Sequence, residues 1–169
     1  MSARDFTSDC GNCAALCCLA LAFDKGEHFA HDKAAGEPCK HLDHHDCSIH
    51  TNLAERGYKG CAAYECAGAG QRVTAMFGQS WREVPKQVAP MMAAFRTMRD
   101  VQELRQILEA AATFPLPEKT AEEREAWLAA LDSEWTPQSL ARFEANATAR
   151  AIRDWLRGLA DYVPRTQNS

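Results

Sequence analysis

Apolar positions in the second half of the chain recur every three or four residues, which is the spacing of an amphipathic helix. One series follows Pro90, a residue that can stand in the first turn of a helix, and it must end before the two prolines of residues 114–117. Its apolar positions are Met91, Phe95, Met98, Leu104, Leu108 and Ala111. The methionines at 91, 92 and 98 are expected to fill gaps in the core rather than to bind a metal. The pattern predicts one long helix here.

Two more helices are predicted towards the end of the chain. Thr120 and Glu123 have the spacing of a capping box ahead of an apolar run that contains Trp127, Leu128 and Leu131. Thr136 and Pro137 form a second helix start. The helix that follows would carry Leu140, Phe143, Ala147, Ala151, Trp155 and Leu159 on one side. Three amphipathic helices with short connections predict a bundle, or a helical layer packed on the first half of the chain.

The first half of the chain has a different pattern. It is rich in glycine and poor in alternating β-branched residues, and it predicts helices only around residues 13–23 and 48–56. All eight cysteines lie between Cys10 and Cys66, and all six histidines lie between His28 and His50. We therefore expect a mainly α fold, with an irregular cysteine-rich metal-binding region (1–80) packed against a small helical bundle (81–169). The two regions would join near residue 80, or would form one compact unit.

Length and charge exclude several partners. A chain of 169 residues is the size of one domain, or of a small domain with a helical appendage. Lys and Arg number 19 against 23 Asp and Glu, so the net charge of −4 argues against nucleic acid and against an anionic membrane surface. The apolar run of residues 14–23 is too short to span a bilayer. We expect a cytoplasmic protein that binds neither nucleic acid nor membrane.

That compartment decides how the cysteines are interpreted. A reducing cytosol keeps thiols free unless a metal or a catalytic reaction holds them, so disulfides are the minority interpretation. The first half has little apolar surface with which to order itself, and small regions with thin cores usually need a metal or a disulfide to hold them together. A metal ion is therefore the expected stabilising element.

The spacing of the thiols is dense enough to predict a metal site. The predicted ligands are Cys10, Cys13, Cys17, Cys18, Cys39, Cys47, Cys61 and Cys66. If residues 10–18 were helical, Cys10, Cys13 and Cys17 would share one face and Cys18 would lie off it. Alternatively, Gly11 allows a tight turn and the helix starts at Cys13.

The number of thiols leaves the kind of site open. Tetrahedral zinc and a [4Fe-4S] cluster each take four thiolates, so eight allow one site with spare thiols or two sites. Thiolates also bind Cu(I), so ligand type does not choose the metal. Histidines 41, 44, 45 and 50 could complete a mixed shell, and His50 is the best of them because it lies three residues after Cys47.

Other interpretations of these residues are weaker. Cysteine is often a small buried apolar residue, which suits one or two thiols better than eight. A thioredoxin-like motif at Cys10 and Cys13 lacks the surrounding βαβ pattern. The GAGQ stretch of residues 68–71 lacks the preceding strand and the following lysine of a phosphate loop, so we expect a flexible segment there.

The cysteine pattern resembles a known family. The runs CGNCAALCC at 10–18, PCKHL at 38–42, CSIH at 47–50 and GCAAYEC at 60–66 look like the YkgJ-type domain, described as zinc- or iron-chelating. Residues 10 to about 112 are closer still to the cysteine-rich region found beside pentapeptide repeats in actinobacterial proteins, although no such repeat occurs here. Ala14 replaces a usual glycine, and His50 a usual tyrosine. The resemblance implies that all eight cysteines are candidate ligands and that the helix after Pro90 belongs to the same unit.

Three functions remain open from the sequence. The leading hypothesis is a metal-binding protein that holds zinc or an iron–sulfur cluster, with the helical half supporting the site or binding a protein partner. The second is a redox enzyme or sensor that depends on a cluster or a thiol, favoured by the adjacent Cys17 and Cys18. The third is a cytosolic buffer for Cu(I). No hydrolase triad or nucleotide fingerprint is present, so an enzyme is not the leading expectation.

Overall fold

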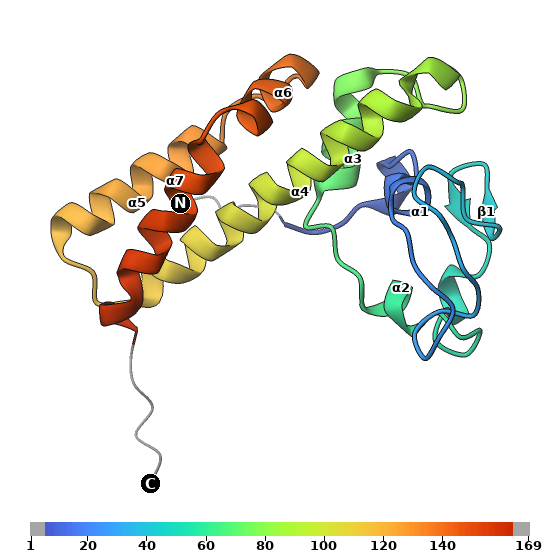
Figure 1. The fold of residues 1–169 in the computed structure, drawn as a ribbon, viewed down its shortest axis with the longest axis horizontal. Coiled ribbons are helices and arrows are strands. Elements are labelled where there is room, and N and C mark those ends of the chain that lie inside the picture. The colour runs from blue at the N-terminus through green and yellow to red at the C-terminus, as the bar shows by residue number, and fades with distance from the viewer. Residues whose placement is uncertain (1–5, 164–169) are drawn as a thin grey trace, which may run out of the picture.

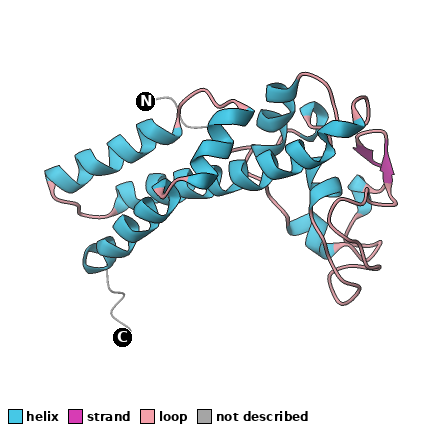
Figure 2. Ribbon diagram, turned by 45° about the horizontal axis from the view of Figure 1, so that its top comes forward, coloured by secondary structure: helices cyan, strands magenta, loops and turns pink. Residues whose placement is uncertain are grey.

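The fold is built almost entirely from helices. The computed structural model describes residues 6–163 (Figures 1 and 2). Its α-helices are α1 (Leu16–Ala20), α2 (Lys59–Ala63), α3 (Ala69–Phe77), α4 (Val88–Ala110), α5 (Glu118–Leu131), α6 (Pro137–Ala145) and α7 (Thr148–Arg157). Short 3-10 helices are η1 (Cys10–Asn12), η2 (His50–Asn52), η3 (Pro85–Gln87), η4 (Ala111–Thr113) and η5 (Gly158–Tyr162). The strands β1 (Leu42–Asp43) and β2 (Asp46–Cys47) pair antiparallel, with Leu42 opposite Cys47. The predicted mainly α fold is confirmed.

Helix α4 connects the two ends of the molecule. It packs against α1 and α3 at the cysteine-rich end, and against α5, α6 and α7 (Figure 1). Pro90 lies in its first turn and Ala110 is its last residue, before Pro115, as the sequence predicts. Met91 and Met98 are buried in the core, as expected for gap-filling side chains.

One continuous core contains side chains from both halves of the sequence. Leu16 and Leu19 of α1 and Val73 of α3 are buried in the same cluster as Phe95 of α4 and Leu128 of α5. The indole Nε1 of Trp81 donates to the carbonyl of Ala14 at 2.7 Å, which ties the start of α1 to the segment before α4. The division near residue 80 therefore does not coincide with a break in the core, and two separable regions stay a prediction.

The segment between α1 and α3 is poorly packed. Among residues 21–66, only Lys33, Ile49 and Tyr58 are buried. Figure 2 shows this segment as a set of loops gathered at one end of the helical body. Burial of apolar surface, the main stabilising contribution in most domains, is therefore small here, as the sequence indicated.

Several predicted helix boundaries are wrong. Helix α5 starts at Glu118 and no side chain caps it, so Thr120 and Glu123 do not form a capping box. The expected long helix after Thr136 is broken into α6 and α7, because Asn146 adopts extended backbone and its Oδ1 accepts from the Thr148 amide at 2.9 Å. The predicted cap at Thr136 is confirmed: its hydroxyl accepts from the Ser139 amide.

The first half holds two helices that the sequence did not predict. Helix α3 starts at Ala69, within the GAGQ stretch that was expected to be flexible. Left-handed conformations at Ala67 and Gly68 turn the chain into this helix. Helix α2 follows Tyr58. In the part of the chain that the structure describes, no helix is both long and apolar enough to cross a membrane.

Candidate metal centre

The eight cysteines predicted as ligands all line one cavity. The cavity has a volume of about 790 Å3 and is bounded by α1, α2, β2 and the loops between them. Its sulfur-bearing residues are Cys10, Cys13, Cys17, Cys18, Cys39, Cys47, Cys61 and Cys66. Residues that span 57 positions of the sequence are thus brought to a single space, and all eight are free thiols.

The thiols lie on the walls of this cavity. Within residues 6–163, no three His, Cys, Asp or Glu side chains lie close enough together to hold an ion. Metal ligation by the eight cysteines therefore stays a prediction, and the fit of the cavity to a metal is judged from its contacts and charges.

Cys13 and Cys66 flank the first turn of α3. A Cβ on Gly70 would lie 2.5 Å from the Sγ of Cys13 and 3.8 Å from that of Cys66, so only glycine allows both sulfur atoms this close to the helix. The Ala14 amide donates to Thr74 Oγ1 at 2.9 Å, which holds the chain beside Cys13 against α3. Ser8 Oγ lies 3.1 Å from the Sγ of Cys66. At this end of the cavity, the thiols of Cys13 and Cys66 are therefore held close to the first turn of α3.

Cys17 and Cys18 lie side by side on α1, with their sulfur atoms 4.0 Å apart. The hydrogen bond between the two thiols lowers the pKa of Cys17 to about 7, and backbone amides and Lys33 act in the same direction. The same bond raises the pKa of Cys18, and burial adds to that rise. Of this pair, Cys17 is therefore the thiol that ionises more easily, while Cys18 keeps its proton.

Burial makes four more of the thiols poorer acids than an ordinary cysteine. It is the main reason that the pKa values of Cys10, Cys13 and Cys47 are raised, and it raises that of Cys61 to about 11. Neighbouring thiolates raise all four further. A cation in the cavity would instead lower the pKa values of these thiols, because thiols that coordinate a metal lose their protons.

Lys33 places a buried positive charge beside the thiols. Its Nζ donates to the carbonyls of Leu21 at 2.6 Å and of Leu19 and Ala34 at 3.2 Å. Burial lowers the pKa of Lys33, whereas thiolates at Cys39, Cys18 and Cys17 would raise it. A lone lysine in a loop belongs to no sequence motif, so this residue was not predicted.

Two buried polar atoms at the cavity have no partner. Within the described residues, Tyr64 Oη and His45 Nε2 are buried and make no hydrogen bond, and both side chains line the cavity. Such orphaned groups are rare and costly unless a ligand or ion satisfies them. His50, the histidine favoured by its spacing, also lines the cavity but is exposed. Among these two histidines, the geometry favours His45 as an additional ligand.

Aromatic side chains form another wall. The hydroxyl of the buried Tyr58 lies 2.9 Å from His41 Nε2 and 3.0 Å from His31 Nδ1. Phe23 stacks on Phe29 with ring centroids 4.3 Å apart. The His31–Tyr58–His41 chain was not found from the sequence, because its members are 10 and 17 residues apart and follow no motif.

Comparison with known proteins identifies one relative of unassigned role. The chain is 40% identical over 115 residues to the uncharacterized protein YybG of Bacillus subtilis (strain 168). The match covers 66% of this chain but only 41% of YybG, so the chain spans about two fifths of that relative. No protein-family model matches the chain, and no solved structure matches it. The resemblance to the YkgJ-type domain and to the region beside pentapeptide repeats stays a prediction.

Proposed function

We propose that this chain is a metal-binding protein that holds zinc or an iron–sulfur cluster with thiolates from the cysteine cavity. The observation that carries the proposal is that all eight cysteines, from four separate segments of the sequence, line one space. In a reducing compartment such as the cytoplasm, thiols gathered in this way are kept for a metal or for redox chemistry.

The energetics of the region support a structural metal. Residues 21–66 bury only three side chains, and burial of this kind cannot offset the entropy of ordering so long a loop. A structural zinc site contributes on the order of 10 kcal/mol to folding. The metal would hold the loops together, and the helices would support them or bind a protein partner.

Electrostatic interactions link Cys17 with thiols on several sides of the cavity. Cys10 interacts with Cys17 and Cys66, and Cys13 interacts with Cys17. On the other side, Cys18 and Cys61 both interact with Cys39 and Cys47. Cys17 also interacts with Cys18, Cys47 and Cys61. Eight thiols that line one cavity are enough for one four-thiolate zinc or [4Fe-4S] site with spare thiols, or for two such sites.

Metal analysis of protein purified without oxygen tests the proposal. We expect one or two zinc ions per chain, or iron and sulfide with absorbance near 400 nm. Cys66→Ser and Cys61→Ser should each lower the metal content, because each removes one predicted thiolate ligand. Protein that holds no metal, takes up neither zinc nor iron and sulfide on reconstitution, and leaves all eight thiols open to a thiol reagent would overturn it.

His45 offers a matched control. His45→Ala removes the buried unpartnered nitrogen, whereas His44→Ala removes an exposed ring whose Nδ1 lies 2.9 Å from Asp43. If His45 serves as an additional ligand, only its variant should weaken metal binding, by about 10- to 100-fold. Equal metal affinities in the two variants would show that His45 is not a ligand, and would leave the proposed thiol ligands unaffected.

A second candidate function, as a thiol-dependent redox enzyme or sensor, rests on Cys17. A thiol with a pKa of about 7 is partly ionised at neutral pH, and the thiolate is the nucleophile in redox chemistry. Iodoacetamide at pH 7 should then label Cys17 well before Cys61, whose pKa is about 11. Uniform labelling of all thiols would argue against a redox role.

A further inference from the structure

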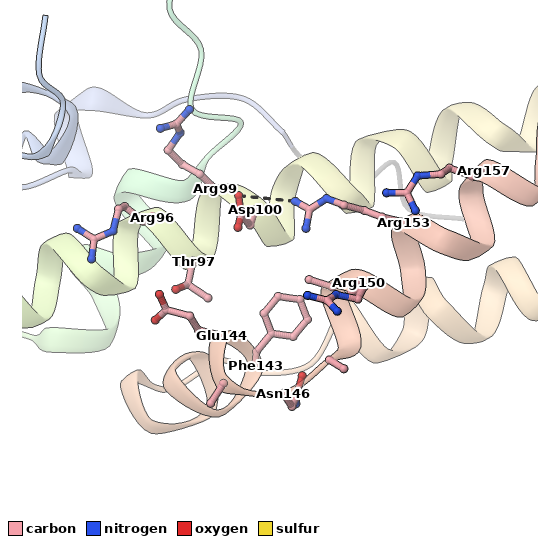
Figure 3. Close-up of a pocket in the computed structure, with 13 residues that line it drawn as sticks. Arg96, Thr97, Arg99, Asp100, Phe143, Glu144, Asn146, Arg150, Arg153 and Arg157 are labelled. Atoms are coloured by element: carbon pink, nitrogen blue, oxygen red, sulfur yellow. Dashed lines mark ion pairs between the residues drawn. The ribbon is translucent and has the colours of Figure 1, made fainter.

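A second hollow lies near the cysteine cavity, because Arg99 in its lining stands over the ring of Tyr64 in the wall of that cavity. It has a volume of about 920 Å3 and lies between α4 and the α6–α7 corner (Figure 3). Five arginines line it, against two carboxylates, Asp100 and Glu144. The arginines are Arg96, Arg99, Arg150, Arg153 and Arg157. A chain with a net charge of −4 thus gathers positive charge at this one hollow.

The spacing of the arginines on α7 explains how they meet. Positions 150, 153 and 157 are three and four residues apart, so they share one face of the helix. Figure 3 shows these three side chains projecting into the gap towards α4, which contributes Arg96 and Arg99. Buried Ile152 holds α7 on the core and so fixes this orientation.

The carboxylates around the hollow neutralise the arginines only weakly. Arg153 lies 3.8 Å from Asp100 and 3.7 Å from Glu103, and all three side chains are more than one-third exposed. Exposed ion pairs of this kind contribute at most about 1 kcal/mol to the stability of the folded protein. Arg157 pairs with Asp154, and Arg99 stands over the Tyr64 ring. Among the described residues, Arg96 and Arg150 have no carboxylate partner within salt-bridge distance.

We propose that this arginine hollow binds a small organic phosphate of about the size of a nucleotide. Guanidinium groups bind phosphate oxygens through paired hydrogen bonds, and several arginines can share one polyphosphate. The volume lies within the range of small-molecule sites and favours a compact ligand over a long polymer. Ala145, Ala147 and Ala149 offer apolar surface for the organic part.

Calorimetric titration with ATP and with inorganic tripolyphosphate, at about 0.15 M salt to screen diffuse attraction, tests the proposal. We expect saturable binding of ATP at one molecule per chain. Arg150→Ala/Arg153→Ala should weaken it about tenfold or more, because two guanidinium contacts are lost. Arg142→Ala/Lys119→Ala removes two exposed positive charges outside the hollow and should leave the affinity unchanged.

The outcomes separate the possible ligands. Tighter binding of ATP than of tripolyphosphate shows that the organic part contributes, and equal binding shows that the phosphates suffice; both support a phosphate site. Absence of saturable binding, equal weakening in the control variant, or tighter binding of a polyglutamate peptide than of either phosphate would overturn it. Because none of these measurements depends on metal, they are independent of the test of the cysteine cavity.

Discussion

Gly70 and Cys13 approach so closely that a Cβ on the glycine would lie 2.5 Å from the cysteine sulfur. Gly70→Ala should therefore rotate the Cys13 thiol away from the cavity. Alanine favours a helix by about 1 kcal/mol over glycine, so α3 itself should not be weakened. We expect the variant to fold and to lose metal affinity about tenfold or more, measured by competition with a chromophoric chelator.

Gly26→Ala is the control for this substitution. A Cβ at Gly26 would have no heavy atom within 4 Å, and its backbone is not in the left-handed region. Metal affinity in this variant should equal that of the parent chain. A Gly70→Ala protein with unchanged metal content and affinity would show that Cys13 is not a ligand.

Lys33→Met should destabilise the protein by about 2 kcal/mol or more, because three carbonyls lose their hydrogen-bond donor in a buried site. It should also raise the pKa of Cys17, since the ammonium group of Lys33 helps to lower it. Urea denaturation and alkylation of Cys17 as a function of pH measure the two effects. The exposed Lys25→Met should change neither, and similar losses in both variants would contradict this role.

A polar network joins the cysteine-rich end to the helical end. The buried Gln102 Nε2 donates to the carbonyl of Ala67, and its Oε1 accepts from Arg105. Arg105 Nε donates to Asp132 Oδ1 at 2.8 Å. Arg105→Met would leave the Gln102 and Asp132 acceptors without this donor. It should lower the free energy of unfolding by about 3 kcal/mol.

The same variant tests whether the two halves unfold together. Because Arg105 connects both, a single denaturation transition should move to lower urea as a whole. The exposed Arg142→Met should leave the transition in place. Two separate transitions, of which only one shifts, would show that the regions are independent units.

The His31–Tyr58–His41 chain predicts sensitivity to acid. Burial lowers the pKa of both imidazoles below their ordinary value of about 6.5. The unfolded chain therefore binds protons more readily, so the free energy of unfolding is highest above about pH 6.5 and falls as the pH drops. Two protonated rings would also leave the Tyr58 hydroxyl without an acceptor.

Tyr58→Phe measures this contribution. At pH 7.5 the loss of two hydrogen bonds should cost about 1 kcal/mol or more. At pH 5 the difference from the parent chain should be smaller, because the chain of hydrogen bonds is already broken. Tyr162→Phe is the control, since its hydroxyl makes no hydrogen bond among the described residues. A pH-independent difference at Tyr58 would contradict the role of the histidines.

Features that depend on the spacing of neighbouring residues were predicted correctly. Features that depend on a single side-chain contact or on an unusual backbone conformation were missed. The start of α4 and its end before Pro115 depend on proline and on neighbouring apolar positions, and both were predicted. The break at Asn146 was missed because the apolar spacing continues through it, while one side-chain hydrogen bond to Thr148 starts a new helix. The helix at Ala69 was missed because left-handed residues 67 and 68 turn the chain there.

The sequence by itself determined the mainly helical fold, the long central helix and the concentration of thiols in one half, because helix periodicity, proline stops and residue counts are local properties. Only the tertiary structure decided that eight thiols line a single cavity, that Gly70 admits Cys13, that Lys33 lies beside Cys17, and that five arginines share a hollow. These relationships depend on loop closure and packing between residues far apart in the chain, which no local pattern encodes.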